Sequence, residues 1–206
     1  MASPLVNVPQ VHSMIGQTLS LEYLEDNGHN FKIDDVNDAI IKFSLYRTKE
    51  LFYKYIERMA NHCVINQNSD GTNDFVEIVS LIHEDNVVKY CDKHSTFMHG
   101  DLSVENIIQT DKGMFLIDPI YKEDQWSSYL LDISKMMHSY RKYNRMFEYE
   151  VFLNGWLREG LDEYILRLLE VSQWIRVLKY ILDPELKEEY EQKTKLLLKE
   201  VIKYKK

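Results

Sequence analysis

Two acids and one amide stand close together in the middle of the 206-residue chain. Asn106 follows Asp101 by five residues, and Asp118 follows an apolar run that ends at Ile117. Phosphoryl transfer needs a carboxylate that orients the attacking hydroxyl and receives its proton. It also needs hard oxygen ligands that hold Mg2+ against the phosphates of a nucleotide. Asp101 fits the first role, and Asn106 and Asp118 fit the second.

The surrounding pattern predicts the elements that would bring these three side chains together. We expect a strand at 97–98, a polar loop at 99–106 and two further strands at 107–108 and 114–117, joined by a hairpin turn at 111–113. A hairpin of this kind places the polar loop beside the end of the last strand. The sequence therefore predicts that these residues, although apart along the chain, form one acidic site.

At this point the residues resemble a known family. His99-Gly100-Asp101, Asn106 and Ile117-Asp118-Pro119 resemble the catalytic core of the aminoglycoside phosphotransferase and choline kinase family, the small-molecule relatives of protein kinases. Gly100 stands where protein kinases usually carry Arg, and Pro119 where they carry Phe, which favours the small-molecule branch. The sequence of this core looks most like that of the short phosphotransferases found with bacterial surface-polysaccharide genes.

The resemblance implies an activity and its cofactors. Asp101 would be the catalytic residue, Asn106 and Asp118 would bind Mg2+, and ATP would be the phosphate donor, with GTP left open. The acceptor would be a hydroxyl of a small molecule such as a sugar, an amino alcohol or an aminoglycoside-like compound.

The resemblance also assigns supporting residues. Asp132 resembles the acid of a downstream Asp-Leu-Ala segment that braces the catalytic loop through backbone N–H groups, so we interpret it as structural. His99 is expected to pack behind the loop and to hydrogen-bond to it. Glu22 and Leu24 end a strand that looks like a kinase hinge, where backbone groups meet the adenine edge. Ser103 could donate to the γ-phosphate or satisfy its own backbone.

Plainer interpretations stay open beside these. An isolated His-Gly-Asp is commonly a turn, because Gly permits positive φ and Asp caps the residues after it. Asp118 could simply end a strand, because a residue before Pro is pushed to extended geometry. Arg176 lies in an apolar helical pattern with Trp174, which is most simply core. Arg176 is thus an acceptor contact or a buried ion-pair partner.

Composition limits the classes of function. With 45% hydrophobic and 12% aromatic residues, the chain can bury a core as one domain, with or without a small appendage. The net charge of -8 argues against non-specific nucleic-acid binding and against adhesion to an anionic membrane. Cys63 and Cys91 follow no metal spacing and predict free thiols. Without a secretory or membrane-spanning pattern, we expect a cytoplasmic location.

The rest of the chain predicts an α+β, protein-kinase-like fold that is mainly the helical C-lobe with a catalytic β-hairpin and a truncated N-lobe. A β-hairpin is expected within 8–24, so that 1–25 form a remnant N-lobe hairpin and hinge and 26–206 form the C-lobe. A helical pattern is expected to begin at Asp34 or Asp35 and to run to about 59, either continuous or broken near Arg47. Further helices are expected at 73–89, 127–143, 147–158, 161–182 and 185–204.

The sequence departs from the kinase pattern upstream of the hinge. Residues 1–16 contain no G-x-G-x-x-G loop, and the first Lys of the chain is Lys32. The chain could be a fragment, could receive the missing lobe from a partner or neighbouring protomer, or could work with a reduced N-lobe. Two hypotheses remain: a Mg2+- and ATP-dependent kinase, or a non-catalytic kinase-like module that binds nucleotide or a partner.

Overall fold

The computed structural model describes residues 11–15, 18–21, 25–26, 31–45, 52–65, 75–120 and 128–205, with the backbone alone for 11–15, 18–21 and 62–65. Within these ranges two short β-hairpins accompany a set of helices. The hairpins pair β1 (Val11–Ile15) with β2 (Thr18–Leu21) and β3 (Ile107–Thr110) with β4 (Gly113–Leu116). The helices are α1 (Ile33–Ser44), α2 (Tyr53–Ile65), α3 (Val76–Ile82), α4 (Asp85–Lys93), α5 (Tyr129–Lys142), α6 (Met146–Arg158), α7 (Glu163–Leu178) and α8 (Pro184–Ile202).

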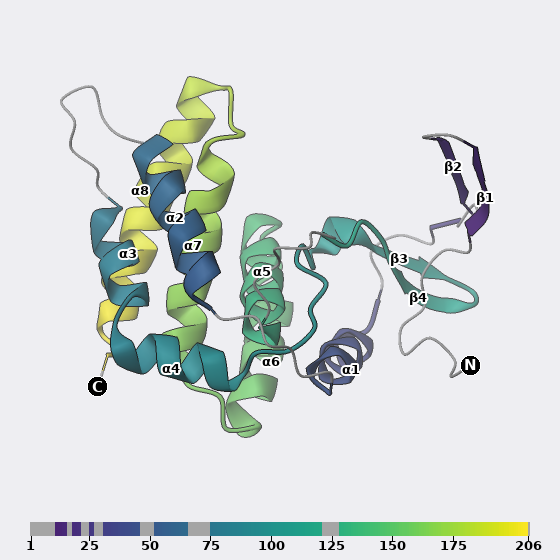
Figure 1. The fold of residues 1–206 in the computed structure, drawn as a ribbon, viewed down its shortest axis with the longest axis horizontal. Helices are drawn as coiled ribbons and strands as arrows, with labels where there is room; N and C mark the ends of the chain where they lie inside the picture. The colour runs from purple at the N-terminus through teal and green to yellow at the C-terminus, as the bar shows by residue number, and fades with distance from the viewer. Residues whose placement is uncertain are drawn as a thin grey trace.

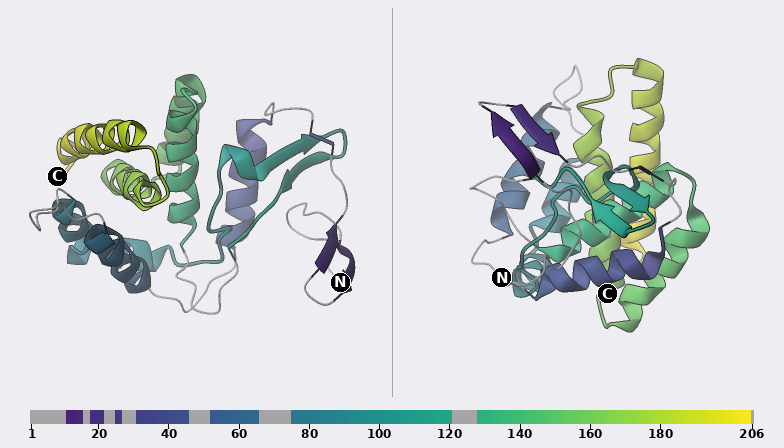
Figure 2. Two further views of the ribbon diagram at one scale, coloured as in Figure 1. Left: turned by 90° about the horizontal axis from the view of Figure 1, so that it is seen from above. Right: turned by 90° about the vertical axis from the view of Figure 1, so that its right-hand side faces the viewer.

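Four of the helices and the two hairpins occupy opposite ends of the molecule, with α5 and α6 between them (Figure 1). Helices α2, α3, α7 and α8 gather at one end, and β3–β4 with β1–β2 lie at the other. Seen from above, α5 stands between the α7–α8 pair and α1 (Figure 2). The mainly helical architecture that the sequence predicts is therefore present.

Helix α7 is the centre of the core, because it packs against α5, α8, α3 and α2. A helix surrounded in this way is apolar on nearly every side rather than along one stripe. Trp174 is fully buried there, as predicted. Arg176 is also buried, and its guanidinium donates to Gln173 Oε1 at 2.6 Å.

Two helix predictions are wrong in detail. Helix α1 begins at Ile33, so Asp34 and Asp35 lie in its first turn, where negative charge favours the helix dipole, instead of capping it. The single helix predicted at 73–89 is two helices, because Glu84 adopts an extended backbone and α4 starts afresh at Asp85. The Glu84 carboxylate pairs with Lys205 Nζ at 2.5 Å beside this break.

The N-terminal hairpin predicted within 8–24 is present. β1 and β2 run antiparallel, with Val11 opposite Leu21 and Ile15 opposite Thr18. Asp26 Oδ1 accepts from the backbone N–H of Gln109 at 3.3 Å, which links the segment after this hairpin to β3. Glu22 and Leu24, the predicted hinge positions, lie outside the described residues.

The second hairpin follows the loop that carries Asp101 and Asn106, and it leads to Asp118. Ile107 pairs with Leu116 and Thr110 with Gly113, around a turn at 111–112. The last strand begins and ends one residue earlier than predicted. The strand predicted at 97–98 is wrong, because the backbone there is irregular and only an isolated bridge at Thr96 precedes it.

Among the described residues, no helix is both long enough and apolar enough to cross a lipid bilayer.

Candidate active site

The loop that carries Asp101 is fastened to the start of α5. The buried carboxylate of Asp132 accepts from the backbone N–H groups of His99 at 2.7 Å and of Gly100 at 2.9 Å. Gly100 has a φ of 87°, a left-handed conformation that a residue with a Cβ adopts only under strain. These are the contacts that the predicted bracing role requires, and the role itself stays a prediction.

The Asp132 carboxyl has an unusual acidity. Burial raises its pKa to about 7, and the nearby Asp101 charge acts in the same direction. The two backbone N–H donors favour the ionised form and lower the pKa. Burial outweighs them because the carboxyl is completely enclosed.

A second set of contacts holds the other end of the loop, the single 3-10 turn Val104–Asn106. The backbone N–H of Val104 donates to Ser139 Oγ on α5 at 2.9 Å. The Glu105 carboxylate accepts from Lys142 Nζ at 2.6 Å and from the Tyr143 hydroxyl. Burial raises the pKa of Glu105, but the donors Lys142 and Tyr143 prevail and hold it at about 2. Helix α5 therefore anchors the loop at both ends.

The carboxylate of Asp101 is held from two sides. Its Oδ1 lies 2.9 Å from Lys135 Nζ, and its Oδ2 accepts from Asn106 Nδ2 at 3.2 Å. Asn106 Nδ2 also donates to the backbone carbonyl of Asp101 at 2.8 Å. The structure thus brings together Asp101 and Asn106, as predicted from their spacing. Sequence reasoning assigned no role to Lys135, although its position three residues after Asp132 puts both on one face of α5.

The direction of the Asn106 amide is fixed by its hydrogen bonds. Because both of its Nδ2 hydrogen bonds are directed to Asp101, the Oδ1 atom is turned away from that residue. The Asn106 backbone carbonyl accepts from the N–H of Ile117 at 3.0 Å, which ties the loop to the residue before Asp118. Asn106 and Asp118 are therefore linked through one backbone hydrogen bond.

Asp118 has a strained backbone. It is exposed, and its φ of 53° lies in the left-handed region, which is uncommon for a residue other than Gly. The simple interpretation of Asp118 as an extended strand end before Pro119 is therefore wrong. Ile120 N–H donates to the carbonyl of His99 at 2.9 Å and returns the chain to the catalytic loop. Strain of this kind is concentrated at functional sites and needs surrounding contacts to hold it.

The His99 imidazole is buried, and the charges of both acids act on it. Burial lowers the pKa of its imidazole, whereas the charges of Asp101 and Asp118 act in the opposite direction. Both carboxylates therefore lie within electrostatic reach of this one ring. The ring is buried behind the loop, as predicted, and the backbone of Ile117 favours its protonated form, so the predicted hydrogen bond to the loop stays a prediction.

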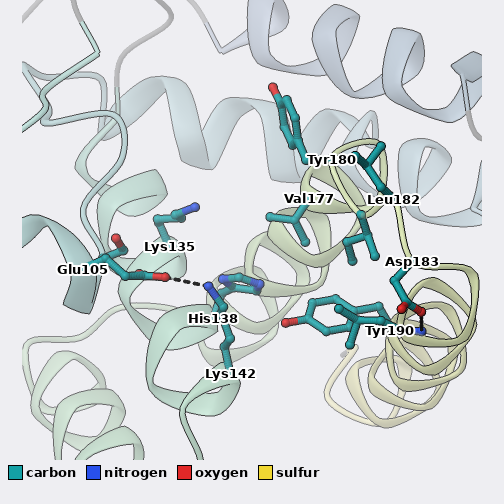
Figure 3. A pocket seen from close by; sticks show the side chains of 12 residues that line it. Glu105, Lys135, His138, Lys142, Val177, Tyr180, Leu182, Asp183 and Tyr190 are labelled. Atoms are coloured by element: carbon teal, nitrogen blue, oxygen red, sulfur yellow. Dashed lines mark hydrogen bonds and ion pairs between the residues drawn. The ribbon is translucent and has the colours of Figure 1, made fainter.

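A cavity of about 540 Å3 opens beside Lys135 (Figure 3). Its walls come from the catalytic loop, one face of α5, the end of α7 and the start of α8. Ser103 lies on this wall, buried, and its hydroxyl makes no capping bond to the 3-10 turn that it precedes. The lining residues are Ser103, Glu105, Lys135, His138, Lys142, Val177, Tyr180, Ile181, Leu182, Asp183, Leu186 and Tyr190.

The donor set fits a magnesium ion that is shared with a nucleotide. Within the described ranges, no group of three or more His, Cys, Asp and Glu side chains could form a metal centre by itself. Mg2+ is usually bound through one or two carboxylates, with phosphate oxygens and water as the other ligands. The carboxylate of Asp118 and the Oδ1 of Asn106 are a set of this type.

Comparison with known proteins gives a likeness of fold. No protein-family model matches the chain, and no curated protein matches it by sequence. A crystal structure of a Haemophilus somnus 129PT protein, provisionally named a fructosamine-3-kinase, superposes with a TM-score of 0.54 and 18% identity. The match covers 95% of this chain and 73% of that one. The chain therefore shares the fold of a protein named as a small-molecule kinase, which agrees with the kinase-like fold predicted from the sequence.

Proposed function

We propose that the chain is a phosphotransferase that uses ATP and Mg2+ to phosphorylate a hydroxyl group of a small molecule. The observation that supports this most is the held carboxylate of Asp101, with Asn106 turned outward beside it and Asp118 at the end of the adjoining hairpin. The fold shared with a protein named as a fructosamine-3-kinase agrees with a small-molecule acceptor.

Each residue has a defined task in the proposed reaction. Asp101 accepts a hydrogen bond from the acceptor hydroxyl, orients its oxygen toward the γ-phosphorus and takes its proton as the bond to the phosphate forms. Asn106 Oδ1 and the Asp118 carboxylate would hold Mg2+, which neutralises the charge on the β- and γ-phosphates. Asp132 keeps the loop backbone in place. Ser103 is a candidate donor to the γ-phosphate, and the backbone near Glu22 and Leu24 is a candidate adenine contact.

The acceptor would reach Asp101 from the cavity beside Lys135. Figure 3 shows Lys135, His138 and Lys142 on the α5 wall of that cavity, with Tyr180 and Tyr190 on the other side. The ring nitrogens of His138 are buried and have no hydrogen-bond partner in the described part of the chain. Buried polar atoms without partners are costly and rare, so a polar ligand is a natural complement.

The charged groups and tyrosines that line this cavity suit an acceptor that carries hydroxyl groups. A sugar, an amino alcohol or an aminoglycoside-like compound has this chemistry, and a sugar of a bacterial surface polysaccharide is one example. We place the reaction in the cytoplasm, where ATP is available, without a role for nucleic acid or membrane.

A second function is favoured by one sequence observation. Residues 1–31 contain no Lys and no G-x-G-x-x-G loop, the parts with which kinases hold the phosphates. A chain without these parts would be a binding module for nucleotide or for a protein, or would receive them from a partner or neighbouring protomer.

Titration of Mg-ATP followed by a transfer assay separates the two functions. Asp118→Ala and Asn106→Ala should each weaken Mg-ATP binding by about tenfold or more, because each removes an oxygen ligand from a site with few others. Wild-type chain should transfer labelled phosphate to at least one member of a panel of sugars, amino alcohols and aminoglycosides. Unchanged affinity in both variants would remove the metal assignment. Binding without transfer to any acceptor would favour the module.

A further inference from the structure

We propose that Lys135 is a positioning residue that fixes the carboxylate of Asp101 for phosphoryl transfer, a role that rests on the function proposed above. The Lys135 ammonium lies 2.9 Å from Asp101 Oδ1. Its side chain is only 15% exposed, and that of Asp101 is 35% exposed. Lys135 forms a direct ion pair with Asp101, and Arg58 of α2 lies within electrostatic range of the same carboxylate.

The two oxygens of Asp101 have different partners, and this defines the plane of the carboxylate. Oδ1 pairs with Lys135, while Oδ2 accepts from Asn106. A carboxylate held by a single partner can rotate about its last bond, whereas two partners on opposite sides prevent that rotation. Each oxygen has two acceptor sites, so a hydroxyl can still donate to Asp101 while both contacts remain.

Helix α5 then positions the proposed base, Asp101, at two levels. Asp132 holds the backbone of residues 99 and 100, and Lys135, one turn later on the same helix, holds the side chain of residue 101. Both contacts come from one rigid, well-buried helix. Misplacement of a reacting group by about 1 Å can cost about 100-fold in rate, so a double anchor of this kind has a catalytic consequence.

Lys135 also borders the space from which an acceptor would arrive. It lines the cavity together with Ser103, on the side of α5 that faces α7 and α8. The ion pair therefore lies at the junction between that cavity and Asp101. A lysine here orients the base at the point where the hydroxyl must enter.

The main test is a comparison of Lys135→Met and Lys135→Arg with a matched ion pair elsewhere. Arg167 pairs with Glu163 at 2.8 Å, with side-chain exposures of 15% and 33%, and also donates to the Tyr149 hydroxyl at 3.2 Å. Arg167→Met therefore removes a pair of nearly equal burial, and one further contact, away from the site. We expect Lys135→Met to lower kcat by about 10- to 100-fold with the KM for ATP nearly unchanged. Lys135→Arg should recover most of the rate, and Arg167→Met should keep it.

A double-mutant cycle tests whether Lys135 acts through Asp101. In the Asp101→Asn background, Lys135→Met should lower kcat by less than about twofold, because the group that it positions is already absent. A full additional loss in that background would show that Lys135 acts independently of Asp101 and would overturn the proposal. An unchanged kcat in Lys135→Met, beside an active wild type, would overturn it as well and leave the phosphotransferase function intact.

Hydrogen exchange of the catalytic loop gives a readout that needs no acceptor. Lys135→Met should speed amide exchange in residues 100–106, whereas Lys135→Arg and Arg167→Met should not. Unchanged exchange in Lys135→Met would mean that the loop does not depend on this ion pair and would contradict the proposal. If the wild-type chain binds Mg-ATP but transfers no phosphate, the proposed phosphotransferase function is overturned. The positioning role of Lys135, which rests on that function, then falls as well.

Discussion

At the scale of single residues, the site depends on side chains whose surroundings restrict them. Asp101 is fixed by Lys135 and Asn106, and Asp118 is held in a left-handed backbone conformation. Spacing in the sequence predicted Asp101, Asn106 and Asp118 as site residues, a role that stays a prediction, and it predicted correctly that Asp101 and Asn106 meet. It could not find the ion pair with Lys135, because that contact depends on how α5 packs against a loop more than thirty residues away.

Asp132 gives the first prediction at this scale. Asp132→Asn replaces one of two acceptor oxygens by an NH2 group that faces a backbone donor, so the free energy of unfolding should fall by about 1–3 kcal/mol. Denaturant titration of both chains measures the difference. Equal stability would show that the two backbone hydrogen bonds do not need a carboxylate.

The pH dependence of stability provides a second prediction for the same residue. Burial raises the pKa of Asp132 to about 7 in the folded chain, above its ordinary value of 3.8. Between these two pH values the folded chain keeps a proton that the unfolded chain releases. The contribution of Asp132 to the free energy of unfolding is therefore complete below about pH 4 and is lost as the pH rises through about 7. Asp132→Asn should remove this part of the change in unfolding free energy with pH. Parallel pH–stability curves for the two chains would contradict the assignment.

At the scale of elements, α5 and the β3–β4 hairpin position the site. The spacing of turn residues predicted the hairpin, and helical periodicity predicted α5 to α8 closely, since long periodic segments have strong signals. The break between α3 and α4 was missed because no Gly or Pro marks it within 73–89.

Ser139 tests the link between α5 and the catalytic loop. Ser139→Ala leaves the buried N–H of Val104 without its acceptor, so unfolding free energy should fall by about 1–3 kcal/mol, and the Val104 amide should exchange faster. Ser80→Ala is the control, because that exposed hydroxyl bonds only to Val76 in its own helix. A loss no larger than that of the control would show that the loop is not held through Ser139.

At the scale of the whole molecule, one buried cluster joins three helices. Glu170 of α7 accepts from Arg141 of α5 and from the Tyr149 hydroxyl of α6, each at 2.7 Å. Glu170→Gln leaves the Arg141 charge without its counterion inside the core and should lower the free energy of unfolding by about 3–5 kcal/mol. Glu163→Gln, on a more exposed pair, should cost about 0–1 kcal/mol. Equal losses in denaturant titration would contradict a special role for the buried pair.

The overall architecture was predictable from the sequence in part. Motif and periodicity together predicted a mainly helical fold with a catalytic hairpin, and the shared fold with a protein named as a small-molecule kinase agrees. The hinge at Glu22 and Leu24 and the division at residue 25 stay predictions, because the strand signal there is short and the hinge positions lie outside the described residues. The acceptor also stays a proposal, since the cavity joins residues from four separate segments.

The central claim is that Asp101 takes the proton of an acceptor hydroxyl during phosphoryl transfer. The most direct measurement compares wild type with Asp101→Asn, an isosteric change, in Mg-ATP affinity and in phosphate transfer to the acceptor panel. The variant should bind Mg-ATP as wild type does and transfer phosphate about 10²- to 10⁴-fold more slowly, which is the usual scale of general-base catalysis. Equal transfer by both chains would contradict the claim.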